Sequence, residues 1–150
     1  METYPEMTES SGDQPPPLPG KCMEIPYVRA EVRDLSGRIF RIVETHVVPG
    51  LDLDGYGSPV VLVPPDRKNL NLFNMHWRLF IQRGDCGHEL GTVIGMDDPF
   101  PEPGEFRGLR NFSVAEPVQP GIAGEGFQGV SITVYSFDGR RYLGGRSDYR

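Results

Sequence analysis

The sequence predicts an all-β fold, and both its composition and its patterning support this. Among 150 residues there are 19 glycines and 15 prolines, and helix interiors tolerate neither. Apolar and polar residues alternate with the period of two that strands have, and no segment has convincing helical periodicity. We therefore expect one domain of about eight antiparallel strands, built as a sandwich, a jelly roll or a small barrel with long Gly/Pro loops.

The first 20 residues differ from the rest of the chain. They contain almost no aliphatic residues and end in the proline-rich run "PPPLP" at positions 15–19. Such a segment cannot bury enough apolar surface to offset its ordering entropy. We expect 1–20 to be a disordered arm, either a solubilising tail or an arm lying over a neighbour, and 21–150 to be the β-domain. The acidic start lacks the basic and apolar regions of a secretory signal.

Two hairpins are indicated by similar turn chemistry. Val28, Ala30 and Val32 alternate with charged residues, and the sequence "DLSG" at 34–37 is typical of a type I turn with a bulge. The strand that follows, "RIFRIVETHVV", is apolar on both faces near its start, as expected for a strand covered on two sides. A second turn of this kind, "FDGR", predicts another hairpin near the C-terminus.

Further strands are expected around 58–65, 73–82, 89–95 and 109–115, and in the segment 128–136. In that last segment we expect Val130, Ile132 and Val134 to face the core, with Thr133 and Tyr135 outside. Three long loops, 49–59, 96–108 and 116–129, hold much of the glycine, proline and acid. Function on β-scaffolds often lies in such loops.

The clearest strand pattern runs from 73 to 82. Trp77 falls on the face with the larger apolar residues and is predicted to lie in the core. The opposite face carries four candidate contact residues. It is either solvated or covered by a partner, and its aromatic member favours a partner. These candidates are Asn74, His76, Arg78 and Phe80.

The turn after this strand, "RGDCGH", contains potential metal ligands. If Gln82 pairs roughly with Glu89, His76 lies roughly 23 Å along the strand from the turn, far beyond the 2–2.5 Å ligand distance of a metal ion. Cys86 and His88, with Asp85 and Glu89, would need ligands from another segment. We interpret the turn as a polar hairpin loop and expect no catalytic, metal or cofactor site.

Charge and cysteine content restrict the environment and the partners. The net charge of −6 argues against a protein that binds nucleic acid through its phosphates. No stretch approaches the 18 apolar residues of a membrane span. Cys22 and Cys86 are too few for a disulfide framework, so we interpret them as free thiols in a reducing compartment, the cytoplasm or a virion, with one bridge between them as the alternative.

These observations favour a non-catalytic β-domain that acts through protein–protein contacts. A viral or phage structural component, a homo-oligomer and an accessory subunit of a larger assembly all fit. The alternative is a carbohydrate- or small-ligand-binding module, in which calcium assists. It would use loop aromatics and acids, namely Tyr56, Phe100, Asp52 and Asp54.

Two fragments resemble motifs of the trimeric dUTPases, which are small all-β enzymes. They are "GLDL" at 50–53, similar to a Gly-x-Asp-Leu motif, and "GEGFQG" at 124–129, similar to a glycine-rich arm with Gly-Phe. The family's Asp-x-Asp-Tyr-Arg motif is absent from the middle of the chain, and "SDYR" occurs only at the C-terminus. The resemblance would imply a nucleotide pyrophosphatase, which is the remote enzymatic hypothesis.

Overall fold

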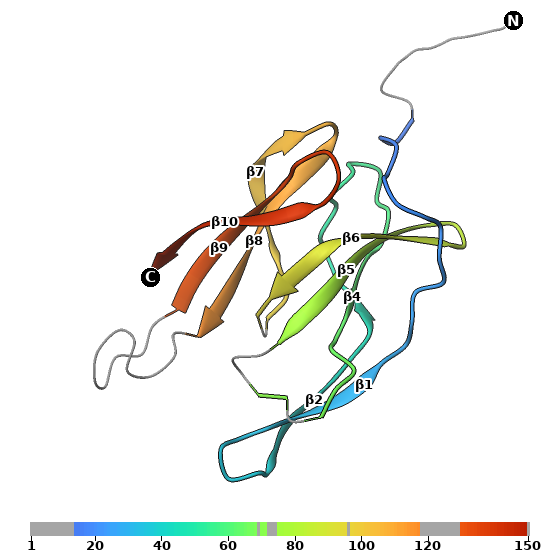
Figure 1. The fold of residues 1–150 in the computed structure, drawn as a ribbon. Helices are drawn as coiled ribbons and strands as arrows, with labels where there is room; N and C mark the ends of the chain where they lie inside the picture. Colours follow the sequence, from blue (N-terminus) through green and yellow to red (C-terminus); the bar gives the residue numbers. More distant parts are fainter. Residues whose placement is uncertain (1–13, 69, 72–74, 96, 118–129, 150) are drawn as a thin grey trace, which may run out of the picture.

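The computed structural model describes residues 14–68, 70–71, 75–95, 97–117 and 130–149 (Figure 1). These residues form strands and no helix, so the all-β prediction is confirmed, and no helix in this part of the chain could cross a bilayer. The strands are β1 (Arg29–Arg33), β2 (Ile39–Glu44), β3 (His46–Val47), β4 (Val60–Val63), β5 (His76–Arg83), β6 (Cys86–Ile94), β7 (Phe100–Phe106), β8 (Leu109–Pro117), β9 (Val130–Phe137) and β10 (Tyr142–Tyr149).

Eight of these strands form one curled sheet, in the order β3-β4-β5-β6-β10-β9-β8-β7. It consists of two antiparallel halves, β3 to β6 and β7 to β10, because consecutive strands within each half are neighbours. The halves meet only where Tyr142 of β10 pairs in parallel with Gly91 of β6. The prediction of antiparallel pairing is therefore wrong at this contact and at an isolated parallel bridge between Val32 and Leu70, and confirmed for the other strand pairs.

A single main core lies between the two halves of the sheet. Trp77, Leu79 and Ile81 of β5 share it with Phe112 of β8 and Tyr142 of β10. Trp77 is 4% exposed, which confirms its predicted core position, and its Nε1–H donates to the Gly95 carbonyl at 2.7 Å. One sheet can supply both walls of this core because it curls at the β6–β10 contact (Figure 1).

Strands β1 and β2 form a separate two-stranded ribbon outside the curled sheet. The predicted turn is confirmed: the Asp34 carboxylate accepts from the amides of Ser36 and Arg38, and Gly37 has a φ of 88°. The expectation that the second strand is covered on two sides is wrong. Ile39, Phe40 and Ile42 are about half exposed, because the ribbon packs on the core through one face only.

The predicted loop 96–108 contains a strand, β7. It includes Pro101 and Pro103, which made it resemble a loop, yet it pairs with β8 at both of its ends. A proline can occur in an edge strand because its missing N–H need not face a neighbour. β7 is the last strand of the sheet, and its pairing is irregular between Pro101 and Glu105.

The orientation predicted for β9 is wrong. Thr133, Tyr135 and Phe137 are buried, whereas Ile132 and Val134 are only half-buried; the side chain of Val130 lies outside the described residues. The rings decide the orientation, because Tyr135 stacks on Phe112 at a centroid distance of 5.1 Å. Burial of two aromatic side chains outweighs burial of smaller aliphatic ones.

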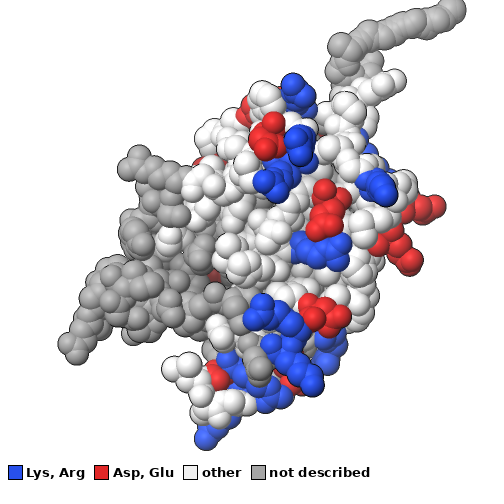
Figure 2. All heavy atoms as spheres, viewed as in Figure 1, with Lys and Arg blue, Asp and Glu red and all other residues white. Residues whose placement is uncertain are grey.

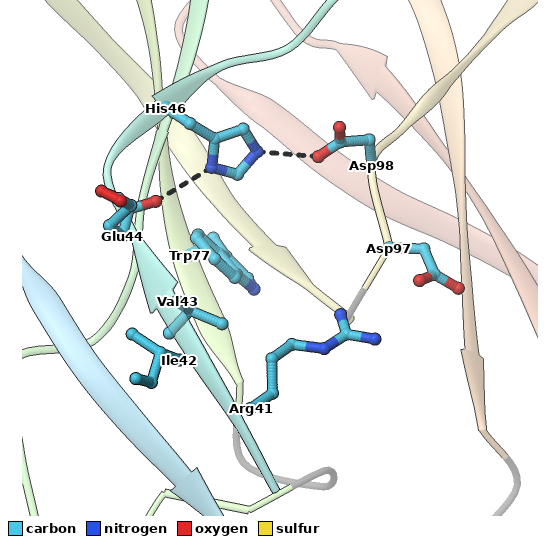
Figure 3. Close-up of a pocket in the computed structure, with 8 residues that line it drawn as sticks. All are labelled: Arg41, Ile42, Val43, Glu44, His46, Trp77, Asp97 and Asp98. Carbon is cyan, nitrogen blue, oxygen red and sulfur yellow. Dashed lines mark hydrogen bonds and ion pairs between the residues drawn. The ribbon is translucent and has the colours of Figure 1, made fainter.

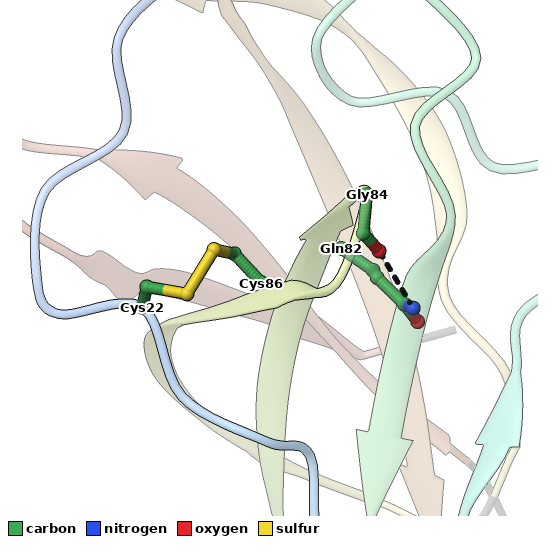
Figure 4. The surroundings of a disulfide bond; sticks show 4 residues. All are labelled: Cys22, Gln82, Gly84 and Cys86. Atoms are coloured by element: carbon green, nitrogen blue, oxygen red, sulfur yellow. Dashed lines mark hydrogen bonds between the residues drawn. A yellow bond between two sulfur atoms is a disulfide. The ribbon is translucent and has the colours of Figure 1, made fainter.

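Cys22 and Cys86 form a disulfide (Figure 4). The interpretation of these cysteines as free thiols is therefore wrong, while the compartment stays a prediction. The bond attaches a segment that we call the N-terminal strap, residues 20–28, to the β5–β6 hairpin. Met23 and Gly87 reinforce the attachment with two backbone hydrogen bonds of 3.1 and 2.7 Å.

The described part of the predicted arm, 14–20, has no regular secondary structure and lies against the domain. Leu18 packs on the main core, and the Arg83 guanidinium donates to the Pro16 carbonyl. Residues 1–13 lie outside the described residues, and so does the glycine-rich "GEGFQG". The division of the chain at residue 20 stays a prediction.

Candidate functional site

On the strand face predicted to meet a partner, the aromatic residue is covered by the chain itself. Phe80 is completely buried in a second small core with Val61 and Val63, under Met23, Ile25 and Val28. Its cover is therefore the N-terminal strap and not a partner. The aromatic residue was correctly recognised as covered, but sequence patterning could not identify a cover that lies about 55 residues away.

The other three candidates on that face have separate positions. His76 is exposed, and Arg78 makes a two-pronged ion pair with Glu89, with both N–O distances 2.9 Å. Asn74 lies outside the described residues. The Arg78 guanidinium also lies over the Phe80 ring, 5.0 Å from its centroid, so these two candidates are in contact.

The hairpin after β5 is tighter than expected. Arg83 pairs with Cys86 and Gln82 with Gly87, so Gln82 lies two residues away from its predicted pairing with Glu89. Cys86 is engaged in the disulfide and is not available as a thiolate ligand or nucleophile. Among the described residues, no three His, Cys, Asp or Glu side chains lie close enough together to hold a metal ion.

Asp54, a candidate for ligand or calcium contact, has a structural position instead. Its side chain is 0% exposed and pairs with Arg83 at 3.0 Å. The carboxylate also accepts from the Ser58 hydroxyl and from the Tyr56 amide. Burial alone would raise the pKa of Asp54, but the hydrogen bonds from Ser58, Tyr56 and Arg83 outweigh burial and lower the pKa below its usual value.

Of the remaining loop candidates, Asp52 and Tyr56 lie near the same arginine, Arg110, and Phe100 lies elsewhere. Asp52 is 40% exposed and lies 3.9 Å from Arg110. Tyr56 lines an open pocket of about 540 Å³ together with Glu105, Arg107 and Arg110. Phe100 is exposed at the other end of β7, where it pairs with Ser113 of β8; Ser113 lies three residues, or about 10 Å, along β8 from Arg110, the partner of Glu105. Tyr56 and Phe100 therefore belong to different surfaces.

An exposed apolar surface that sequence analysis missed lies on the ribbon. We call Leu35, Ile39, Phe40 and Ile42 the ribbon surface; each is about half exposed or more, and Leu35 at the turn is fully exposed. Basic residues gather at the same end of the molecule, where Figure 2 shows a blue patch. They include Arg29, Arg33, Arg67 and Lys68, which line one pocket along β1.

One edge of the ribbon is open. In an antiparallel pair, residues alternate between pointing their N–H and C=O groups at the partner strand and away from it. The Thr45 amide donates to Val28, and Val43 and Arg41 follow the same alternation toward β1. Ile42 and Glu44 must therefore direct their backbone groups away from β1. No strand in the described part of the chain pairs with that edge.

The corresponding edge of β1 is already occupied. The Arg33 amide donates to the Leu70 carbonyl at 2.9 Å, and Val32 and Leu70 form a parallel bridge. Only the β2 side is thus without a partner strand, and only as far as Glu44, because the Glu44 carbonyl lies 2.9 Å from His46 Nδ1 and His46 pairs with Leu62 of β4. We call it the open edge of β2.

A groove of about 440 Å³ runs beside this open edge (Figure 3). His46 and Asp98 lie at one end of it, and Figure 3 shows Arg41 pointing from β2 across the groove toward Asp97. Trp77 forms its floor and meets the His46 ring edge to face, with centroids 5.5 Å apart. The lining residues are Arg41, Ile42, Val43, Glu44, His46, Trp77, Asp97 and Asp98.

His46 is fixed by two acceptors. Its Nε2 lies 2.8 Å from the Asp98 carboxylate, and its Nδ1 lies 2.9 Å from the Glu44 carbonyl. Burial alone would lower the pKa of His46, but the two hydrogen bonds and the nearby carboxylates of Asp98 and Glu44 outweigh it and raise the pKa. Only the protonated imidazolium can donate to both acceptors at once.

Sequence reasoning gave no indication of the His46–Asp98 pair, because 52 residues separate its members. The sequence did contain a signal for the ribbon surface. In "RIFRIV", apolar residues occur on both faces of the strand between charged residues, and this pattern also fits an exposed edge strand that binds a partner.

Comparison with protein-family models, with curated proteins and with solved structures finds no match.

Proposed function

We propose that this chain is a non-catalytic β-domain that acts through protein–protein contacts, as one component of a larger assembly. A viral or phage structural or accessory protein is the class of assembly that we favour. The observation that carries the proposal is the coincidence of the ribbon surface with the open edge of β2. We describe the whole domain as a sandwich formed by one sheet folded over itself.

Physical reasoning supports this use of the ribbon. Native proteins usually protect an exposed edge strand with charge, proline or a covering loop, because unpaired backbone groups recruit other strands. Here Ile39, Phe40 and Ile42 remain exposed along the edge strand. Grouped apolar residues on a protein surface typically mark interaction sites.

The groove supports binding rather than catalysis. His46 and Asp98 form an acid–base pair, but neither serine, threonine nor cysteine is among the residues that line the groove. A histidine of this kind needs a positioned nucleophile or a bound reactant to perform acyl-transfer chemistry. Both of its nitrogens are already engaged in hydrogen bonds.

A site-specific photocross-link tests the proposal. The photoreactive residue benzoylphenylalanine would replace Phe40 in one variant and Leu143 in a control, since these side chains are 53% and 45% exposed on different strands. On illumination in a lysate of the source organism, we expect protein adducts at position 40 and few at position 143. Equal yields at both positions, or none, would contradict the proposal.

The Tyr56 pocket supports the second candidate, a carbohydrate- or small-ligand-binding module. Tyr56 offers a ring for stacking, and Arg107 and Arg110 offer hydrogen-bond donors beside the Glu105 carboxylate. Calcium would have to bind without Asp54, whose carboxylate is buried and paired. A glycan array read with and without calcium tests this candidate, and a nucleotide pyrophosphatase assay tests the remote dUTPase hypothesis.

A further inference from the structure

We infer that the solvent-facing side of the β1–β2 ribbon binds an acidic segment of a partner protein, in which carboxylates flank apolar side chains. The inference rests on the proposed function and names the chemistry of the partner. We call this side the outer face of the ribbon. Its members are Tyr27, Arg29, Glu31 and Arg33 along β1, and Ile39, Ile42 and Glu44 along β2.

The register of the two strands defines this face. Side chains directly opposite each other in an antiparallel pair lie on the same side of the sheet. Arg29 is opposite Glu44. Two residues further along, Glu31 is opposite Ile42. The alternate residue Val32 is completely buried in the main core, so the face that carries the other four residues points to solvent.

The β2 side of the outer face is apolar. Ile39, which lies opposite Arg33, is 49% exposed, and Ile42 is 46% exposed. Tyr27 precedes β1 and is 65% exposed; its hydroxyl donates to the Glu44 carboxylate at 3.0 Å, which places it on the same face. Burial of such side chains against apolar groups is favourable. This side of the face therefore fits apolar side chains of a partner.

The β1 side of the outer face is basic. A β1 amide donates to the Leu70 carbonyl at 2.9 Å, and this contact brings Arg67 and Lys68 beside the strand. These two side chains line a pocket of about 630 Å³ together with Arg29 and Arg33. The pocket lies at the end of the molecule where Figure 2 shows the blue patch.

The acids at this pocket do not neutralise its basic side chains. Glu31 pairs with Arg33 at 2.6 Å, which leaves Asp66 as the other acid of the lining. The remaining three basic side chains form no ion pair with any described residue. The chain has a net charge of −6, yet basic residues outnumber acidic ones four to two here. Such a patch attracts carboxylates, which arginine can bind with two parallel hydrogen bonds.

The apolar side of the outer face distinguishes between kinds of anion. A nucleic-acid backbone or a free phosphate can pair with the arginines, but it would leave Ile39 and Ile42 in water. The carboxylates of Glu31 and Asp66 would also repel a densely charged polyanion. A peptide segment supplies apolar side chains and carboxylates together. Neighbouring strands lie about 4.8 Å apart, so one extended segment reaches both sides of the face.

A photocross-link from the outer face tests the inference. Benzoylphenylalanine replaces Ile42, the variant is illuminated in a lysate of the source organism, and mass spectrometry identifies the linked segments. We expect protein segments in which Asp and Glu outnumber Lys and Arg. Adding Arg67→Glu/Lys68→Glu should lower the adduct yield about ten-fold, because two attractive charges become repulsive.

The matched control is Arg140→Glu/Arg141→Glu, which changes the net charge equally at two exposed residues of the turn between β9 and β10. It should leave the adduct yield at position 42 unchanged. A salt titration adds a measurement that needs no charge variant. Raising the salt from about 50 to about 500 mM shortens the screening length about three-fold, so the yield should fall about three-fold or more.

The outcomes separate this inference from the proposed function. Protein adducts that resist the charge reversal or the salt, or whose linked segments are not acidic, overturn the inference and leave protein–protein contacts standing. Adducts that nuclease treatment removes identify nucleic acid as the occupant and overturn the inference as well. If neither position 42 nor position 40 captures a protein, both proposals fall.

Discussion

Asp54 illustrates how one carboxylate can organise a long loop. It lies in the segment 49–59, which has no strand, and it binds the backbone of that segment at Tyr56 and the side chain of Ser58. Its ion pair with Arg83 then attaches the loop to β5. A residue that resembles a calcium ligand in the sequence is thus a structural anchor.

Asp54→Asn should destabilise the fold by about 3 kcal/mol, because it leaves the Arg83 charge only partly paired in a partly buried position. The lowered pKa of Asp54 means that its stabilisation is present above the ordinary carboxyl pKa near 3.8 and is lost as pH falls through the folded-state pKa. Urea unfolding at pH 7 and pH 3 measures both effects.

The control for this substitution is Asp52→Asn, since the Asp52 side chain is 40% exposed. It should change stability by no more than about 0.5 kcal/mol. The interpretation of Asp54 is wrong if the two variants are equally stable at pH 7.

At the scale of the element, the N-terminal strap converts an outer strand face into a second small core. It covers Val61, Val63 and Phe80 with three half-buried side chains, and the disulfide fixes it to the β5–β6 hairpin. Gly87 permits the close approach, because a Cβ there would collide with Ile25 and touch the Met23 carbonyl. The strap is therefore part of the domain rather than a linker.

Removal of the disulfide should cost about 4 kcal/mol, since it closes a loop of 64 residues in the unfolded chain. The Cys22→Ser/Cys86→Ser double variant, compared with the unaltered chain in urea, measures this loss. Amide exchange should rise first at Met23 and Gly87 and least in β8 and β9. Unchanged protection at Met23 would show that the strap stays docked through its other contacts alone.

Secondary structure was predictable from the sequence where the residues that determine it are close together in the chain. The turn at 34–37 depends on Asp34 and Gly37, which are neighbours, and the alternation around Trp77 correctly assigned its face. The strand β7 was missed because its prolines are tolerated only at the edge of the sheet. The orientation of β9 was wrong because it depends on ring stacking with β8. Both depend on segments distant in the sequence. The site was missed for the same reason: His46 and Asp98 meet only after the sheet has curled.

For the whole molecule, the decisive point is the contact between β6 and β10. It joins the two halves of the curled sheet through one parallel pairing, Gly91 with Tyr142. Gly91 has a φ of 143°, and a Cβ there would lie 2.9 Å from the Tyr142 carbonyl oxygen. The shared core depends on this approach, and alternation along single strands contains no information about it.

Gly91→Ala should therefore destabilise the whole domain by about 2–4 kcal/mol, from strain and from the collision with β10. Gly50→Ala is the matched control: its φ is also positive, but a Cβ there meets open space, so it should cost only about 1 kcal/mol. Thermal unfolding followed by circular dichroism compares them. Similar losses in both variants would argue against a special role of the β6–β10 contact.

The position of the strap also has a consequence for how the chain folds. The strap precedes the strands that it covers, so each of its contacts with the β5–β6 hairpin must close a loop of roughly 60 residues. Closing long loops costs entropy before any contact compensates for it, and such topologies fold slowly. Phe80 and its neighbours should therefore remain solvent-exposed in early folding intermediates. These intermediates should be prone to aggregation until Cys22 and Cys86 come together.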